Sequence, residues 1–367
     1  MTMSPPEHAT PASNDTAAIA SESAEIQAEA GAEASGMSEP NGSGAPARTR
    51  FSKRAKLAIR YGIGALILAA VGRQAWRAWS NWRTHADLFE VSYVTMLWAL
   101  LSYMVGLACF GVYYGLIVRN VKPATAMLAC VRAYLFSHPA KYVPGKAMVV
   151  VVRVGVLGRV GVGAAAASFT AIFETLSMMA IGGLLGGLLL VLPNGHRTGA
   201  AVSFGLGAAF LATVLPWTFG RAVRLLKKGI STIDPADCPS PTRAEAAKLA
   251  ALGVAGWLAW GLSGVLTVSA LSGGEPRPFA EWPRIAGAVL VGTAGGFALP
   301  ILPGGLGLRE GIYNEVTRGI LGPDLAIASA LALRFVWVVG EVIAVAAISL
   351  FAFPIPNETS NSEPANR

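Results

Sequence analysis

Long stretches without a charged side chain constrain the fold of this chain more than any other feature of its sequence. A helix needs about 20 consecutive apolar residues to cross the hydrocarbon core of a bilayer. The longest uncharged or nearly uncharged stretches cover residues 91–118, 160–192, 198–220, 249–274 and 325–353. The sequence therefore predicts an all-α fold, a polytopic membrane helical bundle with about six to eight spanning helices.

The composition supports this fold and narrows the function. Only 14% of the residues are charged and 53% are hydrophobic, whereas a soluble domain carries about a quarter charged residues. The three cysteines, Cys109, Cys130 and Cys238, show no metal-binding or disulfide spacing. No Ser/His/Asp, HExxH, paired-carboxylate or nucleotide-binding pattern is present, and the basic residues form no nucleic-acid-binding face. We therefore expect no cofactor, no metal, no nucleic-acid partner and a transporter-like protein rather than a conventional enzyme.

The chain divides into a polar tail, a membrane domain and a second short tail. Residues 1–47 are rich in Ala, Ser, Glu, Pro and Gly, which predicts a disordered cytoplasmic segment without a signal peptide. Residues 48–353 form the transmembrane domain, and residues 354–367 a polar C-terminal tail. Residues 61–72 are the shortest apolar stretch. The Trp- and Arg-rich segment 73–83 is interpreted as an interfacial helix, with binding of lipid headgroups by its arginines as the alternative.

The distribution of basic residues predicts the orientation in the membrane. With the N-terminus inside, residues 48–60, 119–159 and 221–248 place nineteen Lys and Arg on the inner side, and six fall on the outer side. Because short cytoplasmic loops of membrane proteins carry an excess of Lys and Arg, this count places the N-terminus in the cytoplasm.

Two segments interrupted by Pro and Gly predict an internal repeat. Pro144-Gly145 and Pro303-Gly304 are 159 positions apart, and each precedes a long apolar helix. Repeat one covers about residues 91–192 and repeat two about residues 249–353. Matched broken segments in two halves point to a transporter-type site, with the halves inverted relative to each other. Each break is either a re-entrant turn lining a cavity or an ordinary kink in a spanning helix, and the sequence leaves both open.

Three charged residues lie inside the long apolar stretches, namely Glu174, Arg334 and Glu341. A charge at the centre of a bilayer costs a few kcal/mol, so such residues face the interior of a bundle and find partners. Glu174 and Arg334 hold nearly equivalent positions in the two halves, which suggests an ion pair between them. Arg334 and Glu341 lie two helical turns apart on one face, about 10 Å along the helix axis, which allows a direct contact but does not require one. These charges serve either a structural ion pair or the handling of a headgroup or proton.

The broken segments add cationic candidates to these charges. Arg309 follows the second break and offers a planar fork that suits a phosphate, with Glu310 beside it. Around the first break the cations are Lys141, Lys146 and Arg153. The predicted substrate-binding set is Lys141, Pro144, Gly145, Lys146, Arg153, Glu174, Pro303, Gly304, Gly305, Arg309, Glu310, Arg334 and Glu341.

Several of these residues together resemble the lysylphosphatidylglycerol synthase transmembrane-region family, a flippase-like family of uncharacterised integral membrane proteins. The resemblance covers roughly residues 55–353. It lies in KYVPGK (141–146), Arg153, Arg159, Ser168, Glu174, PGGLGLREG (303–311) and Arg334. It implies the region that translocates an aminoacylated lipid, and we expect the separate synthase domain to be absent. One departure is Thr175, because family members often carry an arginine after the first glutamate.

The leading hypothesis is a flippase-like translocase that moves or binds a lipid with a phosphate headgroup in a bacterial or archaeal cell (inner) membrane. The first alternative is a membrane transferase that modifies a phospholipid or a polyprenyl-linked glycan. The second is a membrane adaptor for a separately encoded lipid synthase or glycosyltransferase. The expected partners are accordingly a membrane lipid and, for the adaptor, such an enzyme.

Overall fold

The computed structural model describes residues 90–143, 147–192, 196–229, 234–298 and 307–350, together with a few isolated positions that include Arg73, Trp76 and Gly305. The chain divides into two compact units, Met1–Leu57 and Ala58–Arg367, and all described residues belong to the second. The described residues form α-helices and short 3-10 turns and contain no strand. The all-α prediction is therefore confirmed.

The helices follow one another along the chain with short connections. In order they are α3 (Tyr93–Val121), α4 (Met127–Ser137), η2 (His138–Tyr142), α5 (Ala147–Leu157), η3 (Gly158–Val160), α6 (Ala164–Val191), α7 (Arg197–Val214), α8 (Pro216–Gly229), η4 (Pro235–Asp237), α9 (Arg243–Ala270), η5 (Phe279–Glu281), α10 (Trp282–Ala298), α11 (Leu308–Leu321) and α12 (Pro323–Leu350).

Five described helices are long and apolar enough to cross a membrane: α3, α6, α7, α9 and α12. The chain is accordingly a multi-pass membrane protein. Helix α9 begins at Arg243, before its uncharged stretch at 249, because Thr242 and Glu245 form a capping box that starts the helix there. The predicted interfacial helix at 73–83 lies outside the described residues apart from isolated positions.

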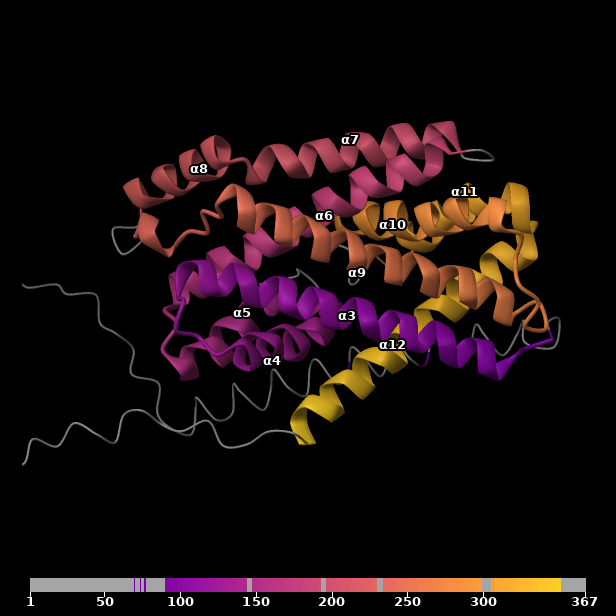
Figure 1. Cartoon of the computed structure of the whole chain (residues 1–367), viewed down its shortest axis with the longest axis horizontal. Coiled ribbons are helices and arrows are strands. Elements are labelled where there is room, and N and C mark those ends of the chain that lie inside the picture. The colour runs from indigo at the N-terminus through magenta and orange to yellow at the C-terminus, as the bar shows by residue number, and fades with distance from the viewer. Residues whose placement is uncertain are drawn as a thin grey trace, which may run out of the picture. The chain divides into compact units, whose positions relative to one another are not determined.

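The two halves of the bundle repeat the same order of elements. A long helix, two short helices and a second long helix follow one another as α3, α4, α5 and α6, and again as α9, α10, α11 and α12. The two first helices pack side by side (Figure 1). They run antiparallel, since the Ser92 N–H donates to the Ala270 carbonyl at one end (2.8 Å) and the Asn120 amide to Glu245 at the other (3.2 Å). The structure thus agrees with the inverted repeat expected from the sequence.

Each pair of short helices folds back on itself. Helices α4 and α5 have 11 residues each, about 17 Å of rise, against about 30 Å for the hydrocarbon core. The chain reverses between them, because Arg153 Nε on α5 donates to Ser137 Oγ at the end of α4 (3.0 Å). In the second half, Arg284 Nε on α10 donates to the Val316 carbonyl of α11 (2.7 Å). Each break therefore connects the two antiparallel helices of one hairpin. The alternative, a kink in a single spanning helix, is wrong for this structure.

Aromatic side chains hold the long helices together. Tyr103 of α3 stacks on Trp337 of α12 and on Trp260 of α9, with ring centroids 4.6 and 5.4 Å apart. Phe110 of α3 packs edge-on against Trp260 at 4.7 Å. All four rings are buried. This aromatic core fixes α12 against the antiparallel pair α3 and α9, and it forms one wall of the charged cluster described next.

Candidate functional site between the two hairpins

Glu341 of α12 is the buried acceptor around which the first hairpin closes. Its Oε1 accepts hydrogen bonds from Lys141 Nζ (2.6 Å), Tyr103 OH (2.8 Å) and Tyr142 OH (3.3 Å). Its Oε2 is buried and has no hydrogen-bond partner among the described residues. Oε1 thus receives three donors, while Oε2 remains able to accept one more. Lys141 and Tyr142 belong to η2 of the first half, so this contact joins the two repeats.

His138 extends this network toward the first hairpin. Its Nε2 lies 2.9 Å from Lys141 Nζ and 3.7 Å from Glu341 Oε1. A lysine ammonium only donates, so Nε2 accepts and the imidazole is neutral with its proton on Nδ1. His138 therefore orients Lys141 toward Glu341 without adding a charge to the cluster.

Arg309 of α11 supplies a cation to the same region from the second hairpin. Its guanidinium carbon lies 3.8 Å from the centre of the Trp337 ring, a stacking worth about 0.5–2 kcal/mol. No carboxylate within the described part of the chain lies at ion-pair distance from Arg309. Arg309 and Arg334 both act electrostatically on Lys141. The region between the hairpins thus holds three cations, and one of them is without a counter-ion.

Glu310 ties the second break to α12. One carboxylate oxygen accepts from Arg334, and the other accepts the Gly307 N–H at 2.8 Å. The bond to Gly307 caps the first turn of α11. Glu310 is therefore occupied on both oxygens and leaves its neighbour Arg309 free to face a ligand.

The first half contains a matching ion pair, with the guanidinium on the short helix and the carboxylate on the long helix. Arg153 of α5 donates to Glu174 of α6 at 2.7 Å, and both side chains are almost fully buried (3% and 2% exposed). Arg153 also lies over the rings of Tyr114 and Tyr134. In the second half the carboxylate is on the short helix α11 and the guanidinium on the long helix α12. Each half thus joins its hairpin to its last long helix by one ion pair, with the charges exchanged.

Two expectations about pairing need correction. Glu174 and Arg334 were expected to pair with each other, but Glu174 pairs with Arg153 and Arg334 with Glu310. Helix α6 packs on α5 and helix α12 on α11, so each charge meets its nearest opposite charge on the adjacent hairpin. Arg334 and Glu341 were considered as direct partners, yet Glu341 pairs with Lys141, which approaches it from η2.

The structure brings together five of the predicted site residues: Lys141, Arg309, Glu310, Arg334 and Glu341. Arg153 and Glu174 form their own pair. Gly305 packs against α10, where an added Cβ would lie 2.9 Å from the Gly296 Cα, and its φ of 70° favours glycine. The remaining predictions, Pro144, Gly145, Lys146, Pro303 and Gly304, lie outside the described residues.

Sequence reasoning missed four residues of the cluster: Tyr103, His138, Tyr142 and Trp337. An aromatic residue in an apolar helix has the same sequence signal as an ordinary core residue, so the two tyrosines and Trp337 could not be singled out. The one available signal was the position of Trp337 between Arg334 and Glu341.

The cluster is closed in this conformation. A cavity of about 10 Å³ lies beside Arg309, Glu310 and Tyr313, which is room for about one water molecule. Among the described residues, no group of three His, Cys, Asp or Glu side chains could hold a metal ion.

Comparison of the chain with protein-family models, with curated proteins and with solved structures found no match in any of the three.

Proposed function

We propose that this protein translocates a lipid with a phosphate headgroup across a bacterial or archaeal cell membrane. The observation that carries this proposal is Arg309, which stacks on Trp337 and has no carboxylate partner among the described residues. An uncompensated charge inside a membrane bundle is costly, so a guanidinium in this position favours an anionic ligand. Its planar fork matches the oxygens of a phosphate.

The contact between Lys141 and Glu341 is the proposed gate. It joins η2 of the first half to α12 of the second and closes the region next to Arg309. Separation of the hairpins would break this contact and admit a headgroup to Arg309. Rocking of two inverted halves around a site near the middle of the membrane is the usual mechanism of alternating access. The chain carries no ATP-binding motif, so transport is proposed to be passive or coupled to an ion gradient.

Two further observations support the proposal. The motifs at 141–146 and 303–311 resemble those of a flippase-like family, and one described cation of each motif, Lys141 and Arg309, belongs to the cluster. The excess of Lys and Arg in the segments 119–159 and 221–248 supports an orientation with these segments and the N-terminus in the cytoplasm.

Reconstitution tests this proposal directly. Liposomes with the full chain and a nitrobenzoxadiazole-labelled phosphatidylglycerol are treated with dithionite, which quenches only the outer leaflet. In protein-free liposomes dithionite removes about half of the fluorescence, and with the wild-type chain it is expected to remove more than half. Arg309→Gln is expected to lower the rate at least about tenfold. Arg318→Gln is the matched control, because Arg318 lies on the same helix but is exposed and pairs only with Glu315 at the surface.

Quenching by the wild type at the protein-free level would reject translocation. It would favour the adaptor hypothesis if a lipid synthase or glycosyltransferase co-purifies with the chain. A rate equal in the wild type and Arg309→Gln would reject Arg309 as the headgroup site even if translocation occurs.

A further inference from the structure

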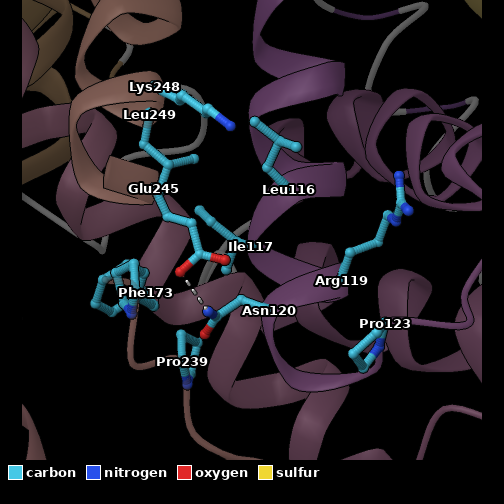
Figure 2. A pocket seen from close by; sticks show the side chains of 11 residues that line it. Leu116, Ile117, Arg119, Asn120, Pro123, Phe173, Pro239, Glu245, Lys248 and Leu249 are labelled. Carbon is cyan, nitrogen blue, oxygen red and sulfur yellow. Dashed lines mark hydrogen bonds between the residues drawn. The ribbon is translucent and has the colours of Figure 1, made fainter. Parts of the chain in front are cut away.

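A second cavity lies at the other end of the antiparallel pair α3 and α9, away from the charged cluster. Its volume is about 270 Å³. It is formed by the last turns of α3, the first turns of α9, Phe173 of α6 and the prolines that precede α9 (Figure 2). This end of the pair lies next to the basic segments 119–159 and 221–248.

The two ends of the α3 and α9 pair are closed in different ways. At one end, backbone hydrogen bonds join the helices, from Ser92 to Ala270 and from Gly273 to Glu90, each 2.8 Å long. At the other end, the hydrogen bonds among the described residues join the two segments through Asn120 alone. The side-chain amide N–H of Asn120 donates to Glu245, and its side-chain Oδ1 accepts from the Ser240 N–H at 2.9 Å. The cavity lies beside this Asn120 bridge.

The cavity combines an apolar floor with a cationic rim. Ile117, Phe173 and Leu249 are buried and line its inner part. Arg119 and Lys248 are exposed and line its rim, and Figure 2 shows them on two sides of Leu116. No carboxylate in the described ranges lies at ion-pair distance from either cation.

Glu245, the one carboxylate of the cavity, is already engaged. It accepts from the Asn120 amide and from the backbone N–H and hydroxyl of Thr242, at 2.8–3.2 Å. These bonds fix the start of α9 and the Asn120 bridge. Arg119 and Lys248 outnumber this carboxylate, so the net charge of the cavity lining is positive.

Helix α8 places this cavity at the level of the membrane surface. Phe219 and Val223 of α8 are buried in the same apolar cluster as Ile117, Phe173 and Leu249. The rest of α8 exposes both apolar and basic side chains: Trp217, Leu225, Leu226, Arg221, Arg224, Lys227 and Lys228. A basic amphipathic helix with exposed Trp and Leu is typical of the interface between headgroups and acyl chains. A lipid headgroup in the adjacent leaflet would lie directly at the rim.

We propose that this cavity binds the headgroup of an anionic phospholipid from the leaflet beside α8. Arg119 and Lys248 hold the phosphate, and the glycerol and the first acyl carbons lie against Ile117, Phe173 and Leu249. This site is separate from the proposed translocation site at Arg309 and does not depend on it. A lipid headgroup and a soluble phosphate both present phosphate oxygens to these cations. A soluble phosphate compound is therefore the competing ligand.

Native mass spectrometry of the full chain in detergent tests this site. Phosphatidylglycerol and phosphatidylcholine are titrated separately, and the dissociation constant of the first bound lipid is measured. The wild type is expected to bind phosphatidylglycerol more tightly than phosphatidylcholine. The double variant Arg119→Gln/Lys248→Gln is expected to weaken phosphatidylglycerol binding by at least about tenfold, because each basic residue near an anionic surface contributes about fivefold and the two effects multiply.

The matched control is Lys122→Gln/Arg243→Gln, which removes the same charge from the same ends of α3 and α9 outside the cavity. The control is expected to bind within about threefold of the wild type. Leu116→Trp, which fills the cavity without a change of charge, is expected to weaken binding as the double variant does. Arg309→Gln is expected to leave this binding unchanged, so failure here and failure of translocation are distinguishable.

Three results would overturn the proposal. The first is equal weakening by the two double variants, which would show a general effect of surface charge. The second is unchanged binding in Leu116→Trp, which would place the lipid outside the cavity. The third is displacement of the bound lipid by millimolar inorganic phosphate or glycerol 3-phosphate, which would assign the site to a soluble phosphate.

Discussion

The ammonium of Lys141 lies 2.6 Å from Oε1 of Glu341, although 200 residues separate the two along the chain. The carboxylate is 2% exposed and the lysine 26% exposed. The lysine is therefore the more exposed partner, and the carboxylate is buried. The two residues come from different halves of the bundle. Their contact is therefore present only when η2 of the first half packs against α12 of the second.

Replacement of Glu341 is expected to destabilise the closed bundle. Glu341→Gln leaves the Lys141 ammonium without its counter-ion, and breaking a buried pair in this way costs about 3 kcal/mol in the free energy of unfolding. Lys141→Met in the same chain removes the uncompensated cation and is expected to recover part of that loss. The free energies are measured by denaturation in mixed micelles for the two single variants and the double variant. A coupling energy near zero would show that the contact does not hold the halves together.

Arg309 is expected to need its guanidinium as well as its charge. Arg309→Lys keeps the positive charge but loses the planar stack on Trp337 and the fork for phosphate. We expect it to translocate the labelled lipid about tenfold more slowly than the wild type, and Arg309→Gln more slowly still. The dithionite assay measures both rates. A lysine variant as fast as the wild type would mean that only charge matters at this position.

The pair of Arg153 and Glu174 is expected to stabilise the fold without a direct part in transport. Both side chains are buried, and Glu174 also accepts from Thr175. Glu174→Gln is expected to lower the free energy of unfolding by about 3 kcal/mol. The translocation rate for each folded molecule is expected to stay within about twofold. A variant of normal stability that no longer translocates would instead assign this pair to the transport pathway.

These pairs show which parts of the site the sequence can predict. Glu174, Arg334 and Glu341 stand out because a charge in an apolar stretch is costly, and this physical rule identifies each residue singly. Their partners depend on how the hairpins cross the long helices, which hydropathy does not encode. The equivalence of Glu174 and Arg334 in the repeats was therefore a poor guide to contact.

The fold was more predictable than the site. The lengths of the uncharged stretches identified the long helices, and the paired Pro-Gly breaks identified the two halves. The reversal of the chain at each break could not be distinguished from a kink, because both need the same Pro and Gly residues. The contacts of α4 with α5 and of α10 with α11 decide between them.

Close packing of α6 on α7 is expected to tolerate no side chain at Gly183. A Cβ at this position would lie 2.6 Å from the Gly207 Cα, and Ser203 Oγ donates to the Gly183 carbonyl at 2.7 Å. Gly183→Ala is expected to destabilise the bundle by about 1–3 kcal/mol. Gly205→Ala on the exposed face of α7, where a Cβ meets no atom within 4 Å, is expected to stabilise it by up to about 1 kcal/mol. Equal effects of the two changes in thermal unfolding would contradict this packing.

Cys238 offers a native probe of both orientation and local burial. It lies between η4 and α9, and burial raises the pKa of its thiol to about 11, with Asp237 and Asp234 adding to the shift. Since only the thiolate reacts, labelling by a membrane-impermeant maleimide is expected to be slow near pH 7 and to rise about tenfold for each pH unit up to about pH 10.

If the positive-inside count is right, the reagent reaches Cys238 in inside-out vesicles and not in right-side-out ones. Cys238→Ser is the control that identifies this signal against Cys109 and Cys130, which lie within α3 and α4. Labelling in right-side-out vesicles would reverse the proposed orientation, and a rate that levels off near pH 9 would show that the thiol is not shielded by the surrounding loop.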